Sequence, residues 1–438
     1  MIILRTVKNI SSLNIAASVL LFLAAILAAV VANSSLSPVY QDFLLQELHL
    51  RIGNFNLFSH GGHPLKMIEF INDCLMTVFF LAVGLEIKRE LLVGELSSVR
   101  KAALPFIAAC GGMVVPVVIY ALSVASGTPE TRGMAIPMAT DIAFSLGVLS
   151  LLGKRVPLSL KIFLTAFAVV DDIGGILVIA LFYSADVAYG YLIAAAVLYV
   201  FFYYMGKFGV TQKIFFLFFG VIIWYLFLQS GIHSTISGVI LAFVIPARPR
   251  LDAGKYIERI RDIIGEFPVS KSDNIVLTNA QIATLKQVER ASDYVISPLQ
   301  SLEDNLHGAV SFVILPLFAF ANAGVVFSGS GSIVGDVSIA VAAGLLLGKF
   351  LGIYLFTWLA VKSGVALMPA GMNWKNIAGV SLLGGIGFTV SLFIANLSFA
   401  DEYPELLNQA KFGVLVGTVL AGVLGYVVLN WVLPKREK

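Results

Sequence analysis

The sequence predicts an all-α polytopic membrane protein with about 12 transmembrane helices. Of the 438 residues, 58% are hydrophobic and only 13% are charged, whereas an ordinary soluble domain is about one quarter charged. The apolar residues also come in blocks of about 20, the length that a helix needs to cross a hydrocarbon core of about 30 Å. We therefore expect a single transmembrane domain over residues 1–438.

Twelve apolar blocks are long enough to be read as spans. They lie near residues 13–33, 67–85, 102–124, 134–152, 162–183, 189–205, 213–228, 232–246, 307–327, 337–360, 376–399 and 411–432. The first block has no small-residue cleavage pattern behind it, so we expect it to stay as a helix rather than to be removed as a signal peptide.

The basic residues predict the orientation. The two tails and the loops after even-numbered spans hold 24 Lys and Arg residues, whereas the opposite side holds four. Because cytoplasmic loops are enriched in Lys and Arg, both termini should be cytoplasmic. No basic patch interleaved with aromatic residues is present, so the sequence gives no support for nucleic-acid binding. Cys74 and Cys110 lie inside apolar blocks, where we expect buried thiols rather than a metal site or a disulfide.

Two hydrophilic segments interrupt the spans. In the external segment 37–65, alternating residues flank Gly53 and Asn54, which predicts a short β-hairpin. The cytoplasmic segment 247–306 is long and of mixed charge, and its pattern around 256–264 predicts an amphipathic helix.

The adjacent carboxylates Asp171 and Asp172 are the leading candidates for a functional site. A charge at the centre of a bilayer costs at least about 2.5 kcal/mol, and Asp171 lies about 12 Å into its predicted helix. Neighbouring positions on a helix diverge by about 100°, so the two side chains cannot chelate in parallel. Protons and a hard cation such as Na⁺ would compete for their oxygens, which is the basis of an exchange cycle. The alternative is a capping pair beside a water-filled crevice.

Lys349 is a second charge within a span. It follows Gly344 and Gly348 and precedes Gly352, and this four-residue glycine spacing favours the close approach of other helices. We expect Lys349 to pair with an intramembrane Asp. The alternative is a structural cation that neutralises a buried carboxylate or a helix C-terminus.

Two spans are predicted to be interrupted. Pro137, Thr140 and Asp141 occur together inside one span, and a glycine-rich stretch at 384–387 lies inside another. Where half-helices meet, a carboxylate stabilises opposed N-termini and an ammonium stabilises opposed C-termini. Asp141 and Lys349 are the candidates for these two roles.

Four further groups carry weaker signals. Asp73 lies about two turns into its span, where it either has a functional role or is a structural residue that meets water in a funnel. Glu86 and Arg89 close the second span, where they either set the topology or form a pH-responsive cluster. His233 begins the eighth span and is either a pH sensor or a satisfied structural group.

Several strings in this sequence resemble the NhaA family of sodium/proton antiporters. They are Asn72-Asp73, Gly84-Leu-Glu-Ile-Lys-Arg-Glu90, Ala139-Thr-Asp-Ile-Ala-Phe144, Val170-Asp-Asp-Ile-Gly174, Ser230-Gly-Ile-His233, Leu317-Phe-Ala-Phe-Ala-Asn-Ala-Gly324, Gly348-Lys349 and Gly385-Ile-Gly-Phe-Thr389. The resemblance runs in order from about residue 15 to residue 432. It implies inverted repeats with two interrupted helices.

The resemblance also implies roles for individual residues. Asp172 would be the principal cation ligand, Asp171 a proton carrier able to pair with Lys349, and Asp141 and Thr140 part of the crossing of extended chains. The pH-responsive positions would be Glu86 and Arg89, with Glu303 and His233 as contributors.

At the level of the whole protein, the resemblance implies an electrogenic transporter rather than an enzyme, with no cofactor. It would export Na⁺ or Li⁺ in exchange for H⁺, respond to alkaline pH, and form a homodimer through the external hairpin in a bacterial inner membrane. The segment 247–306 is longer than in the shortest members of the family. Of the properties that the resemblance implies, the pH profile is therefore the one that carries over least directly to this protein.

Three other functions remain open. An intramembrane aspartyl protease needs two carboxylates that converge on one water, which Asp141 and Asp171 could supply but the adjacent pair could not. A proton-coupled symporter for an organic solute would need a clamp such as Arg, and no span interior carries one. A channel would need rings of carbonyls or charges rather than one Asp pair.

Overall fold

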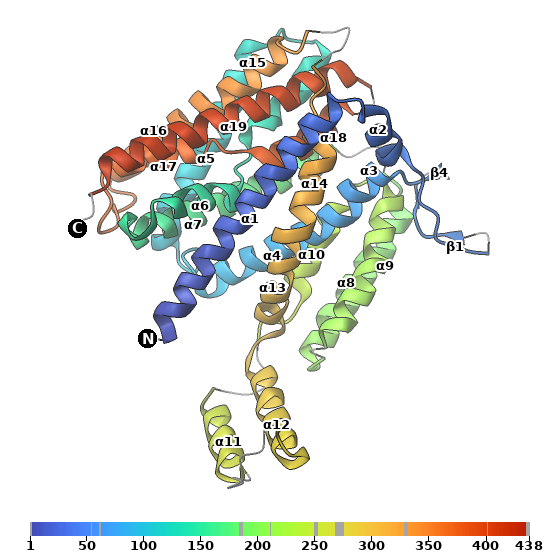
Figure 1. Ribbon diagram of the computed structural model, residues 1–438, viewed down its shortest axis with the longest axis vertical. Helices are drawn as coiled ribbons and strands as arrows, with labels where there is room; N and C mark the ends of the chain where they lie inside the picture. Colours follow the sequence, from blue (N-terminus) through green and yellow to red (C-terminus); the bar gives the residue numbers. More distant parts are fainter. Residues whose placement is uncertain are drawn as a thin grey trace.

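The computed structural model describes all residues except 1, 54, 61–62, 184–186, 211, 249–252, 268–275, 328–331, 401 and 435–438. Within the described residues, nine helices are long and apolar enough to cross a membrane, two bent helix pairs each make one further span, and Thr235–Val244 is a shorter apolar helix. Each of the twelve predicted spans therefore has a helical counterpart, and the predicted all-α polytopic class is confirmed (Figure 1).

The elements along the chain have the following bounds. They are α1 Ile2–Ala32, α2 Ser37–Leu45, β1 Arg51–Ile52, β2 Phe55–Asn56, β3 Ser59–His60, β4 His63–Pro64, α3 Met67–Phe70, η1 Ile71–Leu75, α4 Met76–Val93, α5 Val99–Ser123, η2 Pro129–Met138, α6 Ile142–Leu151, η3 Gly153–Arg155, α7 Leu158–Phe182, α8 Tyr189–Lys207, α9 Lys213–Ser230, α10 Thr235–Val244, α11 Ala253–Gly265, α12 Asn279–Val295, α13 Pro298–Ala309, η4 Val310–Ile314, α14 Leu315–Asn322, α15 Asp336–Ala343, η5 Gly344–Gly348, α16 Lys349–Lys362, α17 Trp374–Leu383, α18 Phe388–Phe399 and α19 Pro404–Val432.

The hairpin predicted around Gly53 is confirmed. Strands β1 and β2 are antiparallel, with Arg51 opposite Asn56, and Gly53 turns the chain with a φ of 63°. A second antiparallel pair, β3 with β4, follows directly and was not predicted. Figure 1 shows these strands on one side of the bundle, the hairpin face, and the two chain ends with α11 and α12 on the other, the terminal face.

The amphipathic helix predicted at 256–264 is confirmed as part of α11, but the predicted end of the long loop was wrong. Helix α13 begins at Pro298 and runs through η4 into α14, so this span starts nine residues before the predicted residue 307. Ser297 caps the helix by accepting the Gln300 backbone N–H at 3.2 Å, and Pro298 occupies the first helical position, which suits proline. Glu303 therefore lies on a spanning helix and not in the loop.

Two hydrophobic cores divide most of the helices into two bundles. Buried side chains of α5, α6, α7, α16, α17 and α19 form one core, and those of α4, α8, α9, α10 and α13 form the other. Because α15 continues into α16 and α18 follows α17, we call the first set with α15 and α18 the crossing bundle. Because α14 continues α13, we call the second set with α14 the flanking bundle. A further apolar cluster, which includes side chains of α4, α14 and α18, joins the two.

The glycine spacing around Lys349 provides close helix contacts, as predicted. A Cβ atom added to Gly348 would lie 2.6 Å from Pro116 Cα, and one added to Gly344 would lie 2.6 Å from Pro137 Cβ. One turn further on, Gly352 contacts the backbone of Gly111 in α5. Small residues thus allow α5 and α16 to pack backbone against backbone.

We expect Gly352→Val to lower the thermal unfolding midpoint of the purified protein, because the new methyl groups would overlap the α5 backbone. Overpacking of this kind costs about 1–3 kcal/mol. The matched control is Gly308→Val, since an added Cβ at this helical position meets open space. Equal midpoints for the two variants in detergent would contradict the packing argument.

Candidate functional site

The two predicted helix breaks meet in the interior of the protein. Residues 139–141 are extended between η2 and α6, and residues 384–387 separate α17 from α18, with each pair bent by 44°. Helix α18 packs against η2, and Ser145 of α6 donates to the Leu383 carbonyl of α17 at 3.0 Å. The first half of each broken span therefore lies beside the second half of the other, which is an antiparallel crossing.

Asp141 holds both of the helices that start at the crossing. Its Oδ1 accepts the Phe144 backbone N–H at 3.0 Å, which caps α6. Its Oδ2 accepts the Thr389 hydroxyl at 2.7 Å and the Thr389 backbone N–H at 3.2 Å, in the first turn of α18. One buried carboxylate thus faces two helix N-termini, the arrangement predicted for this residue.

The carbonyl groups at the opposing helix ends are satisfied by hydroxyls. Thr140 donates to the Gly384 carbonyl at 2.8 Å, and Ser391 donates to the Ile136 carbonyl at 2.8 Å. Lys349 was the predicted cation at these carbonyls, but its ammonium donates its hydrogen bond to Asp171 instead. Short hydroxyl side chains complete the crossing because they reach a carbonyl without introducing a charge.

Lys349 and Asp171 form a fully buried ion pair, as the sequence predicted for Lys349 and an intramembrane Asp. The Lys349 Nζ lies 2.6 Å from Asp171 Oδ2, and both side chains have an exposed fraction of 0%. The ammonium also lies 5.6 Å from the centre of the Phe167 ring. A π-helical turn, η5, ends directly before Lys349. Turns of this type are common at functional sites because they change which way a helix presents its side chains.

Asp172 faces a different environment from Asp171. It lines a cavity of about 780 Å³ together with Asp141, Thr140 and Thr389. The adjacent carboxylates are therefore separated in the way that consecutive helical positions require, one committed to a lysine and the other turned to the cavity. The cavity extends to Glu303 on α13, next to the segment that carries α11 and α12.

Charged residues gather at the mouth of this cavity. Arg89 at the end of α4 contacts Glu303 of α13 at 2.8 Å and Glu90 at 3.2 Å. Glu86, one turn before Glu90, also lines the cavity. Three of the four pH-response candidates, Glu86, Arg89 and Glu303, therefore share one location.

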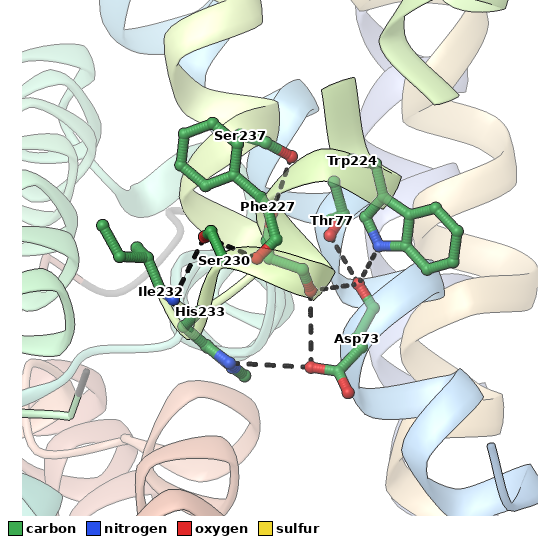
Figure 2. A network of polar contacts seen from close by, with 9 residues as sticks. Asp73, Thr77, Trp224, Phe227, Ser230, Ile232, His233 and Ser237 are labelled. Carbon is green, nitrogen blue, oxygen red and sulfur yellow. Dashed lines mark hydrogen bonds and ion pairs between the residues drawn. The ribbon is translucent and has the colours of Figure 1, made fainter. Parts of the chain in front are cut away.

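His233 and Asp73 lie elsewhere. The His233 Nδ1 is 3.6 Å from Asp73 Oδ1, and neither residue is among those that line the cavity. Figure 2 shows the Asp73 carbonyl accepting from Thr77 and from the Trp224 indole, the latter at 3.3 Å. This network joins η1 to the segment between α9 and α10, so the structure does not bring the fourth pH-response candidate or Asp73 to the Asp171 and Asp172 pair.

Several residues of the site were not predicted from the sequence. Thr389 was quoted only as part of a string, although a hydroxyl in the first turn after a glycine-rich break was an available signal. Asp304 and His307 line the cavity near Glu303. Asp304 was missed because it precedes the predicted start of the span at residue 307, and His307, at that start, was not considered as part of a site.

Sequence comparisons identify relatives of this chain over its full length. The model of the Na⁺/H⁺ antiporter 1 family matches residues 8–429. A protein of Bacteroides fragilis named Na⁺/H⁺ antiporter NhaA is 75% identical over 437 residues and the full length of both chains, and one of Bacteroides thetaiotaomicron with the same name is 74% identical over 438 residues and the full length of both. A third so named, from Parabacteroides distasonis, is 50% identical over 444 residues, which cover 100% of this chain and 98% of its own. With the crossed broken helices and this full-length similarity, the chain belongs to the Na⁺/H⁺ antiporter 1 family.

Proposed function

We propose that the protein exchanges Na⁺ for H⁺ across a membrane, and that Asp171 and Asp172 are the groups that bind them. The observation that carries this proposal is the unequal setting of the two carboxylates. Asp172 borders the cavity, whereas Asp171 is held by Lys349 at 2.6 Å. The names of the full-length relatives support the choice of ions.

In this mechanism, a Na⁺ ion that enters the cavity displaces a proton from Asp172 and takes its oxygens as ligands. Carboxylate, carbonyl and hydroxyl oxygens are the ligands that hard cations prefer. Thr140 and Thr389 line the same cavity as Asp172 and could contribute hydroxyl oxygens. A second proton moves through Asp171 when its pairing with Lys349 changes. Li⁺ is a second hard cation that the same oxygens would accept.

The exchange would carry net charge, because more than one proton would enter for each Na⁺ that leaves. It would be activated at alkaline pH, with Glu86, Arg89 and Glu303 at the cavity mouth as the responsive group and His233 as a contributor. The contacts of Arg89 with Glu303 at 2.8 Å and with Glu90 at 3.2 Å support this assignment. They join α4 to α13 across the cavity entrance, so a change of charge there would alter access to Asp172.

We further propose that the protein is a homodimer in a bacterial inner membrane, with both termini in the cytoplasm. The excess of Lys and Arg on the side of the termini supports the orientation. The β-strands on the hairpin face have edges that a second copy could meet.

The alternative functions fit the geometry less well. A protease dyad of Asp141 and Asp171 would need both carboxylates free to share a water, but Thr389 binds one and Lys349 binds the other. A solute symporter would need a free cation clamp, and Arg89 is taken by Glu303 and Glu90. A channel does not require a buried Lys349 and Asp171 pair.

Asp172→Asn should abolish Na⁺-driven proton movement in proteoliposomes, because an amide cannot bind and release the proton. The measurement is the dequenching of a pH dye between about pH 6.5 and 9, around and above the range in which an unperturbed histidine titrates. Asp262→Asn on α11 is the control for the same chemical change and should respond like the wild type. Wild-type exchange by the Asp172→Asn protein would refute the site. If the wild type responds to neither Na⁺ nor Li⁺, the substrate assignment is wrong.

Lys349→Ala should lower the thermal unfolding midpoint, because it leaves the buried Asp171 carboxylate without its cation. Breaking one partner of a buried ion pair costs about 3–5 kcal/mol. Adding Asp171→Asn to this variant should recover part of the loss, since the unpaired charge is then absent. A double variant that unfolds no later than Lys349→Ala would show that the lysine stabilises the fold through contacts other than this pair.

A further inference from the structure

One face of α18 joins the cavity to the hairpin side of the protein. Thr389, Phe393 and Asn396 occupy positions i, i+4 and i+7, which lie within about 60° of one another on a helix. Thr389 binds Asp141 in the cavity wall. Phe393 packs against Phe80 and Phe318 of the flanking bundle, with ring centres 5.6 Å and 6.3 Å away.

At the end of this face, three asparagines from three separate spans meet. Asn322, at the last position of α14, has an exposed fraction of 0%. Its Nδ2 donates to Asn72 Oδ1 at 2.8 Å, and its Oδ1 accepts from Asn72 Nδ2 at 3.4 Å. Its Oδ1 also accepts from Asn396 Nδ2 at 2.9 Å. We call Asn72, Asn322 and Asn396 the amide cluster.

The bonds of the amide cluster are not equivalent. Asn72 and Asn322 both belong to the flanking bundle, through η1 with α4 and through α14, and they form a reciprocal pair. Asn396 comes from the crossing bundle and adds one bond to an oxygen that already has a donor. If α18 moved away, Asn322 would keep Asn72 as its partner, and Asn396 would keep its bond to the Leu392 carbonyl at 2.8 Å. The inter-bundle bond can therefore break without leaving a buried polar group unsatisfied.

We propose that the amide cluster is an outer latch, which holds the protein in the conformation whose site is reached from the terminal face. This inference rests on the proposed antiport, because exchange requires that the site open to each side in turn. The described cavity reaches Thr389 and Val390 from the mouth at Glu303, and Asn396 lies about two turns beyond Thr389. A path from Asp172 to the hairpin face would separate α18 from α4 and α14, and so would break the bond between Asn396 and Asn322.

The first test measures the opening directly and needs no transport. Phe80→Cys, in a protein with Cys74→Ser and Cys110→Ser, reports access from the hairpin face to a membrane-impermeant maleimide. Adding Asn396→Ala should raise the labelling rate by about threefold to tenfold, the effect of removing one membrane hydrogen bond. Asn396→Leu, which fills similar space without a donor, should raise it equally. Unchanged labelling with Asn396→Ala, or restoration of the slow rate by Asn396→Leu, would overturn the latch.

Asn33→Ala is the matched control. Asn33, directly after α1, is also on the hairpin side. Its Nδ2 donates to the Val325 carbonyl at 2.6 Å and its Oδ1 accepts the Phe327 backbone N–H at 2.7 Å, in the segment after α14. Because these bonds do not involve the crossing bundle, loss of the Asn33 amide should leave the labelling rate at Phe80→Cys unchanged. An equal increase with Asn33→Ala would mean that any lost amide loosens this side, and the specific latch would be wrong.

The second test locks the cluster. With Asn322→Cys and Asn396→Cys in the same protein, a short reducible bis-methanethiosulfonate should stop exchange, and a thiol reductant should restore it, while each single cysteine stays active. Full exchange by the cross-linked protein would refute the latch. Because labelling at Phe80→Cys is read without ion flux, a protein that fails to exchange Na⁺ but still shows the labelling difference would refute the proposed function and not the latch.

Discussion

A backbone that leaves its helix inside a bilayer has no water to bind, and this constraint governs the centre of the protein. The interrupted spans leave amides and carbonyls free at the crossing, and each unsatisfied group would cost several kcal/mol in hydrocarbon. Asp141 supplies acceptors for the amides, while Thr140, Ser145 and Ser391 supply donors for the carbonyls. These bonds link the two broken spans, so a movement of α18 must involve α6 and α17. The site beside the crossing is therefore coupled to the same movement.

The separation of the neighbouring carboxylates follows from the same region. Asp171 faces Lys349 in the packed interior, while Asp172 faces the cavity, because consecutive positions on α7 point to different sides. Two adjacent aspartates therefore provide one carboxylate with a fixed partner and one with access to ions from solvent. In our proposal the fixed pair can take up a proton only by rearranging, whereas the accessible group can exchange its ligand directly. Proton uptake at Asp171 then requires a rearrangement of its ion pair, whereas ligand exchange at Asp172 does not.

Much of this arrangement could be read from the sequence, since it rests on strong local signals. The spans follow from apolar length, the breaks from Pro137 and the glycines at 384–387, and the hairpin from Gly53 and its flanking alternation. The hydroxyl contacts could not be foreseen, because Ser and Thr are common in spans and only the fold decides which carbonyl each one meets. The start of α13 at Pro298 was missed because its first turns are polar, with Glu303 and Asp304 facing the cavity mouth rather than lipid. The separation of Asp73 and His233 from the cavity likewise depends on helix packing.

The π-helical turn before Lys349 has a consequence for how this span can vary in length. A π-turn holds one more residue than the α-helical turn it replaces, so the extra residue is absorbed within the turn. Deleting a single residue between Gly344 and Gly348 would therefore restore a regular helix and leave the Lys349 ammonium on the face that meets Asp171. Deleting a residue from the regular helix α16 would instead swing every residue beyond the deletion by about 100°. The π-turn is thus a position at which this span can change its residue count without separating the buried ion pair.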